Sequence, residues 1–485
     1  MHPDAVQRVL GALLMVFSIT MLPPALFAVV SADGTATAFF LTFVLLLAVG
    51  GVLWLPVRRS RRELRTRDGF FVVAMFWVVL GAAGAVPLVI QDVAPFSIVD
   101  ALFESVSGLT TTGATAIVGI NELPISIQYY RQQLQWLGGM GIIVLAVAIL
   151  PMLGIGGMQL YRAELPGPVK DAKITPRIAE TAKALWYIYL GLTAVCAVAY
   201  WLAGMSVFDA ISHAFSTIAT GGFSTHDESI GYFDSAVIEM IAVVFMIISA
   251  LNYSLHFMAW RRMSIEPWRT DPELRAFLLV IAVVTVLVMG GLFVYQAAHN
   301  LSHDETWHHA IFQVVSFATT TGYTTASYYV WPAFLPVLLL FVAVVGGCAN
   351  STSGGLKVVR VLLLWRQGGR EILRLIHPQA QIPVKMGDRP VNERVIDAVW
   401  GFFAAYVVLF ALLMLTLLAM GLDQITAFSA VASGLANLGP ALGEVAANFA
   451  SVGDGPKLVM CIAMIMGRLE IFTLLVLFTP AFWRR

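Results

Sequence analysis

The chain has 485 residues, of which 59% are hydrophobic and only 12% carry a charged side chain. Soluble proteins have about 25% charged residues, so this composition excludes a soluble globular protein and predicts an all-α integral membrane protein. The 29 basic and 29 acidic residues give a formal net charge of zero, which offers no support for nucleic-acid binding. Cys196, Cys348 and Cys461 stand apart in apolar segments, without metal-ligand or disulfide spacing.

Ten apolar segments are long enough to cross a bilayer, which takes about 20 residues. We expect transmembrane helices near 7–30, 36–57, 70–91, 127–153, 184–204, 235–260, 276–298, 331–365, 395–420 and 457–482. No small-residue cleavage site follows the first of them, so we interpret it as a retained helix and not as a signal peptide.

Within each of the last four pairs of spans lies a shorter segment that ends in a glycine-containing loop. These segments cover 98–111, 207–220, 306–320 and 424–437. The loop glycines Gly113, Gly222, Gly322 and Gly439 are 109, 100 and 117 residues apart, which indicates an internal repeat. We therefore expect two leading helices (1–67) and four helix–pore-loop–helix repeats (68–158, 159–265, 266–375 and 376–485), arranged around a pseudo-fourfold pore.

Lysine and arginine set the orientation of the spans. They gather at 58–67, 162–183, 261–275 and 366–394, between one pair of spans and the next, whereas the segments with the glycine loops hold only Arg131 and Lys457. By the positive-inside rule we expect both termini to be cytoplasmic and the loops to face outward. Acidic residues on the outward segments, including Asp227 and Glu228, either concentrate cations at an entrance or only solvate the loops.

A loop that enters the membrane and returns places irregular backbone at membrane depth, where it must be buried or line water. Glycine permits left-handed backbone angles that aim successive carbonyls at one axis. Four such loops would replace the hydration shell of a cation with oxygens, as in a potassium filter, unless they are re-entrant turns with a purely structural role. The candidate ligands are Thr111, Thr112, Gly113, Thr220, Gly221, Gly222, Thr320, Thr321, Gly322, Asn437, Leu438 and Gly439. Because Asn437 and Leu438 replace threonines, we expect weaker discrimination than in a strictly fourfold filter.

The span at 331–365 is interrupted by small and polar residues, which predicts a broken helix whose loop lines a cavity. Arg468 lies inside the last span, where a charge is expensive and usually functional. We interpret the loop as a gate and Arg468 as its latch; a packed kink and an arginine paired elsewhere are the alternatives. The gate residues are Gly346, Gly347, Asn350, Ser351, Thr352, Ser353, Gly354, Gly355 and Arg468.

With the four loop glycines, the interrupted span and Arg468, the chain resembles the Trk/Ktr/HKT superfamily of cation transporters, most closely its bacterial TrkH branch. The two leading spans are typical of that branch. The resemblance implies potassium as the transported ion and a bacterial inner-membrane location. It also implies a homodimer that assembles with a cytoplasmic TrkA-type ring. That ring binds nucleotides, so no organic cofactor is expected on this chain.

The first hypothesis is therefore gated, channel-like potassium uptake, and the second is a sodium- or proton-coupled potassium symporter. An alternating-access carrier for a larger solute is disfavoured because only one span is visibly broken. We do not expect an enzyme, for want of a nucleophile or a metal cluster. His308 and His309 are neighbours that should point apart on a helix.

Overall fold

The computed structural model describes residues 2–60, 66–144, 178–299, 306–387, 389–469 and 471–484. Helices make up nearly all the regular structure of these ranges. The exception is a two-residue antiparallel pair, β1 (Lys385–Met386) and β2 (Arg389–Pro390). Six helices are long and apolar enough to cross a membrane, and a bent pair makes a seventh candidate. The predicted all-α, multi-pass membrane protein is confirmed.

Two leading spans precede the central part of the molecule. The first was expected as one helix over 7–30 but is divided into α1 (Pro3–Ile19) and α2 (Leu22–Ser31). Pro23 and Pro24 explain the division, because proline lacks the N–H that would continue α1 and suits the first turn of a new helix. The second span, α3 (Ala36–Trp54), packs closely on α1 where Gly11 faces Gly50: a Cβ on either glycine would lie 2.8 Å from the other's carbonyl oxygen.

Four units follow, each built from a long helix, a short helix and a second long helix. They are α4 (Thr66–Ile90), α5 (Ile98–Leu109) and α6 (Ile125–Val144); α9 (Ile178–Leu202), α10 (Val207–Ala219) and α11 (Ala236–Ala250) with α12 (Tyr253–Arg262); α14 (Pro272–His299), α15 (Thr306–Ala318) and α16 (Phe334–Val345) with α17 (Val358–Ile376); and α18 (Glu393–Ala419), α19 (Gln424–Ala436) and α20 (Asp454–Arg468). Short helices link and end the chain: α13 (Glu266–Thr270), α21 (Phe472–Leu475) and α22 (Pro480–Trp483).

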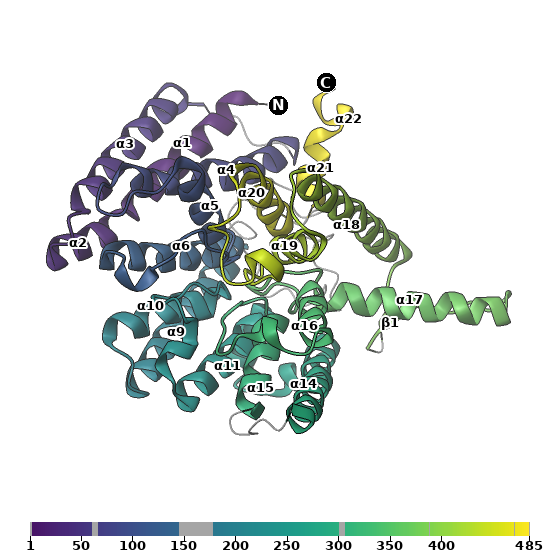
Figure 1. Ribbon diagram of the computed structural model, residues 1–485. Helices are drawn as coiled ribbons and strands as arrows, with labels where there is room; N and C mark the ends of the chain where they lie inside the picture. The colour runs from purple at the N-terminus through teal and green to yellow at the C-terminus, as the bar shows by residue number, and fades with distance from the viewer. Residues whose placement is uncertain are drawn as a thin grey trace.

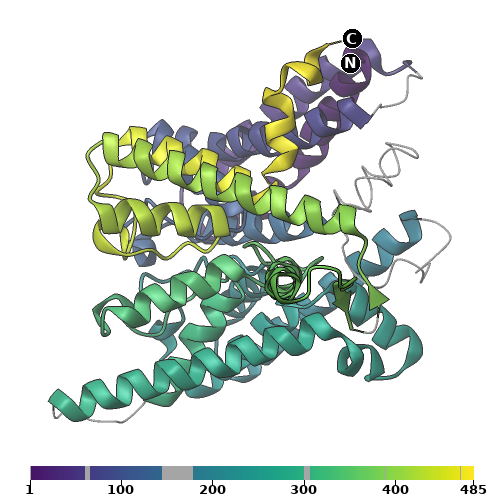
Figure 2. The same ribbon diagram turned by 90° about the vertical axis from the view of Figure 1, so that its right-hand side faces the viewer.

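The four units surround a common centre, and the chain passes around it from blue through green to yellow (Figure 1). Each short helix packs against the second long helix of the preceding unit: α10 on α6, α15 on α11, and α19 on α16. The fourth unit closes on the first, because α20 packs against α5. This packing produces the predicted fourfold ring. The two termini lie close together at one end of the molecule (Figure 2).

Side-chain caps fix where the short helices begin. Ser97 accepts a hydrogen bond from the backbone N–H of Asp100, and Ser206 accepts one from Asp209, in two copies of one Ser-x-x-Asp pattern. In α19 the carboxylate of Asp423 takes this role, with bonds from the N–H groups of Ile425 and Thr426. Since each cap satisfies donors that would otherwise be unpaired, these three short helices start where the sequence places an oxygen-bearing side chain.

Within the described residues, the second unit also has a broken second long helix, in addition to the one predicted in the third unit. The interruption after α16 is confirmed, since residues 346–357 are not helical, and α17 continues to Ile376, beyond the predicted end. The span expected over 235–260 corresponds to a bent pair of helices, because α11 and α12 meet at 93°. Asn252 caps α12, and the N–H of Tyr253 donates to the carbonyl oxygen of Asn350, 3.1 Å away in the interrupted segment. The two breaks therefore stabilise each other.

The span expected over 127–153 begins as α6, which carries Arg131 and several glutamines and is therefore more polar than the six spanning helices. Residues 145–153 and most of the basic segment over 162–183 lie outside the described ranges. The span expected over 457–482 corresponds to α20 followed by the shorter α21 and α22.

Candidate functional site

All four short helices end in the same turn. In each, an N–H group donates back to the carbonyl oxygen of a serine five residues earlier, as in a Schellman motif. The pairs are Thr112–Ser107 (2.9 Å), Gly221–Ser216 (2.9 Å), Thr321–Ser316 (2.8 Å) and Leu438–Ser433 (2.9 Å). The repeated serine is a feature of the sequence that the glycine spacing did not reveal, and it places the four loops in one register.

The four loops share left-handed backbone angles at the same positions, although their side chains differ. Thr111, Thr220, Thr320 and Asn437 have φ between +51° and +54°, and the glycine two positions later has φ of +80° to +97°. A left-handed angle at a threonine costs about 1–2 kcal/mol, and strain of this kind gathers at functional sites. The fourth loop, which looks poorest in sequence, therefore adopts the same conformation as the other three.

The four glycines close a ring. A Cβ added to Gly113 would fall on the carbonyl oxygen of Gly221, one on Gly222 would fall on that of Thr321, and one on Gly322 on that of Leu438. The fourth contact returns to the first loop, since a Cβ on Gly439 would lie 2.7 Å from the carbonyl oxygen of Thr112. Each loop thus presses its glycine against the peptide before the glycine of the next loop, and a side chain at any of these positions would separate two loops.

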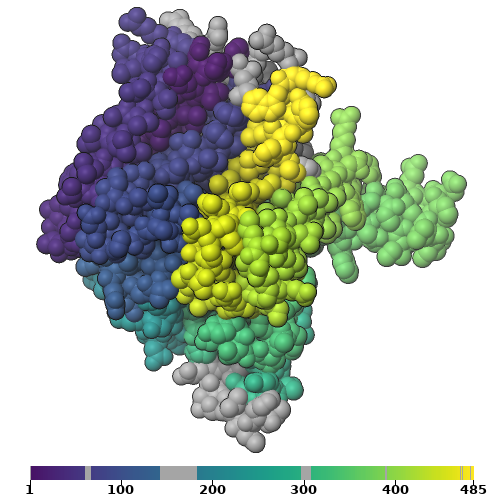
Figure 3. Space-filling view, turned by 45° about the horizontal axis from the view of Figure 1, so that its top comes forward, coloured from purple at the N-terminus to yellow at the C-terminus, as the bar shows by residue number. Residues whose placement is uncertain are grey.

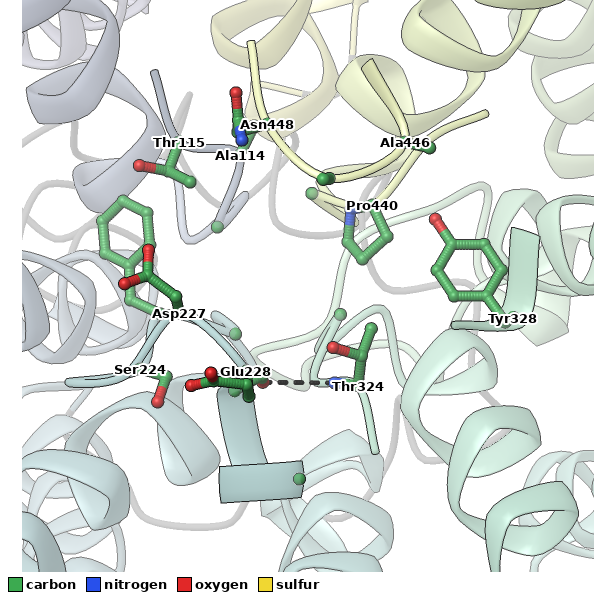
Figure 4. Close-up of a pocket in the computed structure, with 18 of the residues that line it drawn as sticks. Ala114, Thr115, Ser224, Asp227, Glu228, Thr324, Tyr328, Pro440, Ala446 and Asn448 are labelled. Atoms are coloured by element: carbon green, nitrogen blue, oxygen red, sulfur yellow. Dashed lines mark hydrogen bonds between the residues drawn. The ribbon is translucent and has the colours of Figure 1, made fainter. Parts of the chain in front are cut away.

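A cavity of about 420 Å³ opens over this ring, and all four glycines line it. Thr115, Asp227, Thr324 and Pro440 stand around an open centre (Figure 4). Asp227 and Glu228 are the acidic residues that line the cavity. Asp100, Glu104, Asp209 and Asp423 have hydrogen-bond partners within the protein, and Asp304 and Glu305 lie outside the described ranges. Fewer carboxylates therefore face the cavity than the sequence suggested.

Asp209 illustrates that structural use. It lies in the first turn of α10, beside Ser206, Thr225 and His226. Burial alone would raise the pKa of its carboxyl, but hydrogen bonds from His226, Ser206 and Thr225 outweigh burial and hold the pKa well below its ordinary value. Asp209 therefore stays ionised and fixes the N-terminal end of α10.

A buried ion pair behind the first two loops was not predicted. The Nε of Arg131 donates to Glu104 Oε1 at 2.6 Å, and both side chains are almost fully inaccessible to solvent. Arg131 also donates to the carbonyl oxygen of Ser224 at 3.1 Å and stacks over the ring of Phe223 at 4.2 Å. The pair thus connects the first short helix to the segment that follows the second loop. The available signal was a lone arginine on the outward side of an apolar span.

Gln135 completes the second loop. Its Nε2 donates to the carbonyl oxygen of Gly221 at 2.5 Å, and its Oε1 accepts from the N–H of Phe223 at 3.0 Å. Gly221 replaces the threonine found at this position in the first and third loops, and a Cβ there would overlap the amide of Gln135. A side chain from α6 therefore fills the space that the missing threonine leaves.

The loop threonines use their hydroxyl groups within the protein. Thr110 and Thr112 share a hydrogen bond of 2.8 Å, as do Thr319 and Thr321. Asn437 donates to the hydroxyl of Thr112 at 3.0 Å and so joins the fourth loop to the first. These contacts use hydroxyl groups of the first and third loops within the protein.

The predicted gate residues form a loop against this ring, on residues that do not line the cavity. The Thr352 hydroxyl contacts the carbonyl oxygen of Ile218 at 3.1 Å and the Thr220 hydroxyl at 3.2 Å. The N–H of Gly354 donates to the Thr320 hydroxyl at 2.6 Å, and a Cβ on Gly354 would fall on the carbonyl oxygen of Ala436. The loop therefore touches the second, third and fourth short helices where they end.

The other residues of the loop shape its backbone. Gly346, Asn350 and Gly355 have positive φ angles, and Gly347 packs against Ser353. The hydroxyls of Ser351 and Ser353 are 2.6 Å apart. Glu273 of α14 accepts hydrogen bonds from the N–H groups of Ala349 (2.8 Å) and Val359 (3.1 Å), which fixes both ends of the loop.

Arg468, at the end of α20, donates from Nη1 to the carbonyl oxygen of Thr352 at 2.8 Å. Its side chain is buried, and its Nε and Nη2 have no hydrogen-bond partner among the described residues. The sequence-based expectation that Arg468 meets the backbone of the interrupted span agrees with this contact. Arg468 therefore contacts the loop, and the loop contacts the ring.

The chain is similar to known transport proteins over nearly its whole length. The model of the TrkH family, described as cation transport protein, matches residues 25–485. The chain is 58% identical to the Trk system potassium uptake protein TrkH of Vibrio parahaemolyticus over 99% of both chains, and 54% identical to that of Escherichia coli over 100% of both. It is 43% identical to the Trk system potassium uptake protein TrkG of Escherichia coli, over 100% of this chain and 99% of that one.

Among solved structures, the crystal structure of the potassium transporter TrkH from Vibrio parahaemolyticus superposes over the whole of both chains. The TM-score is 0.91, and the identity over the superposed chains is 54%. A family match over most of the chain, relatives above 50% identity and a matching fold agree with one another. The chain belongs to the TrkH family of cation transport proteins.

Proposed function

We propose that this protein takes up potassium across the bacterial inner membrane through a selective, gated pore. The observation that carries the proposal is the closed ring of four glycine loops with one shared backbone conformation. The relatives named above are potassium uptake proteins, and from them we infer that potassium is the transported ion. The proposal includes the division into two leading helices and four repeats, with both termini in the cytoplasm.

The ring would act as the ion filter. Four loops from four similar units present carbonyl oxygens around one centre, and such oxygens can replace the water around a dehydrated potassium ion. The C-terminal ends of the four short helices point at the ring, so their partial negative charges favour a cation there. The unequal loops, with Gly221 and Leu438 in place of threonine, predict a less stringent filter than four identical loops would give.

The loop over 346–355 would act as the gate. It contacts three of the four short helices on the inner side of the ring, so an ion that leaves the ring meets it next. Its glycines allow it to change conformation, and Arg468 holds the carbonyl oxygen of Thr352. Movement of the loop away from the ring would open the path.

The proposal includes a homodimer. Helix α17 projects beyond the rest of the molecule (Figures 1 and 3). Trp365, Ile372 and Ile376 recur at helical spacing on α17 and are all exposed in the single chain. A second copy would cover these side chains. A cytoplasmic TrkA-type ring, which would supply nucleotide control, fits the relatives' description as parts of a Trk system.

Ion flux into vesicles tests this function. The purified protein in proteoliposomes should take up rubidium, as a stand-in for potassium, down its gradient in the absence of sodium. Uptake that needs an inward sodium or proton gradient would instead support the coupled symporter. Absence of cation uptake from correctly inserted, folded protein would contradict both.

A further inference from the structure

Glu239, His308 and His309 form a cluster next to Thr325, one of the residues that line the cavity above the ring. Glu239 lies in the first turn of α11, and the two histidines lie in the first turn of α15. The Nδ1 of His308 is 2.6 Å from Glu239 Oε2, and the two imidazole centroids are 4.2 Å apart. The expectation that His308 and His309 point apart is wrong, because Glu239 and Thr325 each hold one ring on the same side of α15.

The three side chains are a suitable ligand set for a transition-metal cation. Each offers one ligand atom, and these atoms all lie within 4.8 Å of one another. Zinc binds imidazole nitrogen and carboxylate oxygen at about 2.0–2.2 Å, which places neighbouring ligands roughly 3.4 Å apart in a tetrahedral site. Small side-chain rotations would close the set around one ion, and water would complete the coordination.

Because the cluster is buried, the carboxylate of Glu239 needs a positively charged partner. Glu239 is 3% exposed and His308 is 8% exposed. A carboxylate removed from water to this degree needs a cationic partner. A bound metal ion would supply that charge and would use both imidazoles as well as the carboxylate.

The position of the cluster links two parts of the pore. The Nδ1 of His309 is 2.9 Å from the Thr325 hydroxyl, and Thr325 lines the cavity over the ring. Helix α15 leads directly to the loop of Gly322. Helix α11 ends at Ala250, whose carbonyl oxygen accepts a hydrogen bond of 2.9 Å from the N–H of Cys348 in the 346–355 loop.

We propose that Glu239, His308 and His309 bind one transition-metal cation of the zinc class, which joins α11 to α15 beside the cavity. The ion would connect the helix that supports the 346–355 loop to the helix that carries the third glycine loop.

Direct zinc binding tests the site without any transport measurement. Titration of the purified full chain with zinc at neutral pH should show one site per chain. Affinity should fall at least tenfold in Glu239→Gln, His308→Ala and His309→Ala. His377→Ala is the matched control, because His377 is an exposed histidine at the end of α17, far from the cluster in sequence.

Folding is checked in the absence of metal by monodisperse elution and by the unfolding temperature. Glu239→Gln keeps the size and polarity of the side chain, so it remains informative if a histidine variant fails to fold. Zinc binding that is equal in the wild type and in the folded cluster variants, or no binding to the wild type, would overturn the proposal. Equal loss in His377→Ala would also overturn it.

Discussion

Arg468 and Thr352 are 116 positions apart in the chain, yet Nη1 of the arginine donates to the carbonyl oxygen of Thr352 at 2.8 Å. This bond connects the last helix of the fourth unit to the loop that interrupts the third. Because the bond is made to backbone, it depends on where the loop lies and not on which side chain Thr352 carries. It is the contact through which a charged side chain can hold the loop against the ring.

Replacement of Arg468 should therefore open the pore. A hydrogen bond from a charged donor contributes about 1.5–3 kcal/mol, and 1.4 kcal/mol changes an equilibrium tenfold. We expect Arg468→Ala to raise rubidium flux into proteoliposomes by roughly tenfold. Arg484→Ala, at the exposed C-terminal end, should leave flux unchanged. Unchanged or lower flux from folded Arg468→Ala protein would refute the latch.

Gly354 offers a second test of the loop, by steric means. A Cβ on Gly354 would fall on the carbonyl oxygen of Ala436, so Gly354→Ala cannot seat the loop as it lies here. We expect a severalfold rise in rubidium flux. Gly51 of α3 has nothing within 4 Å of an added Cβ, and Gly51→Ala is the matched control with no expected change. If folded Gly354→Ala conducted like the wild type, the loop would not be an obstruction.

The buried pair of Glu104 and Arg131 should be important for stability. Removal of one partner leaves an uncompensated buried charge, which costs about 3–5 kcal/mol. We expect Arg131→Met to lower the unfolding temperature markedly. Arg374→Ala, which breaks an exposed pair with Glu371, should change the free energy of unfolding by about 1 kcal/mol or less. Similar thermal shifts for the two variants would contradict this role.

Gln135 is predicted to support selectivity in the second loop. Gln135→Leu removes the bonds to the carbonyl oxygen of Gly221 and the N–H of Phe223, so this quarter of the ring should become less rigid. We expect the preference for potassium over sodium to fall severalfold. Gln133→Leu is the control on the same helix, because Gln133 bonds instead to Thr20 of the leading helices. Equal selectivity in the two variants would argue against Gln135 as a positioning residue.

The sequence predicted the elements whose signals are local. Apolar length identified the spans, and glycine spacing identified four loops in the correct order. Asn437 and Leu438 made the fourth loop look degenerate, yet the turn depends on a donor–acceptor pair of backbone groups and on an asparagine that tolerates left-handed angles. Backbone conformation was therefore conserved between the loops where side chains were not.

Features that depend on distant contacts were missed. Glu104 and Arg131 are 27 residues apart and meet only when α5 packs on α6. The bend between α11 and α12 has a local capping signal in Asn252. The hydrogen bond from the N–H of Tyr253 to the carbonyl oxygen of Asn350, however, joins the bend to another unit. The cluster of Glu239 with His308 likewise joins two helices that no sequence spacing relates.

The most direct test of the filter is the ratio of potassium to sodium flux in Gly322→Ser. A Cβ at Gly322 would fall on the carbonyl oxygen of Leu438 and crowd Pro440, and the residue has φ of +81°. The matched control is Gly290→Ser, because Gly290 of α14 has nothing within 4 Å of the added atom. We predict that Gly322→Ser loses most of its preference for potassium while Gly290→Ser keeps it. An unchanged preference in folded Gly322→Ser protein would contradict the assignment of the ring as the filter.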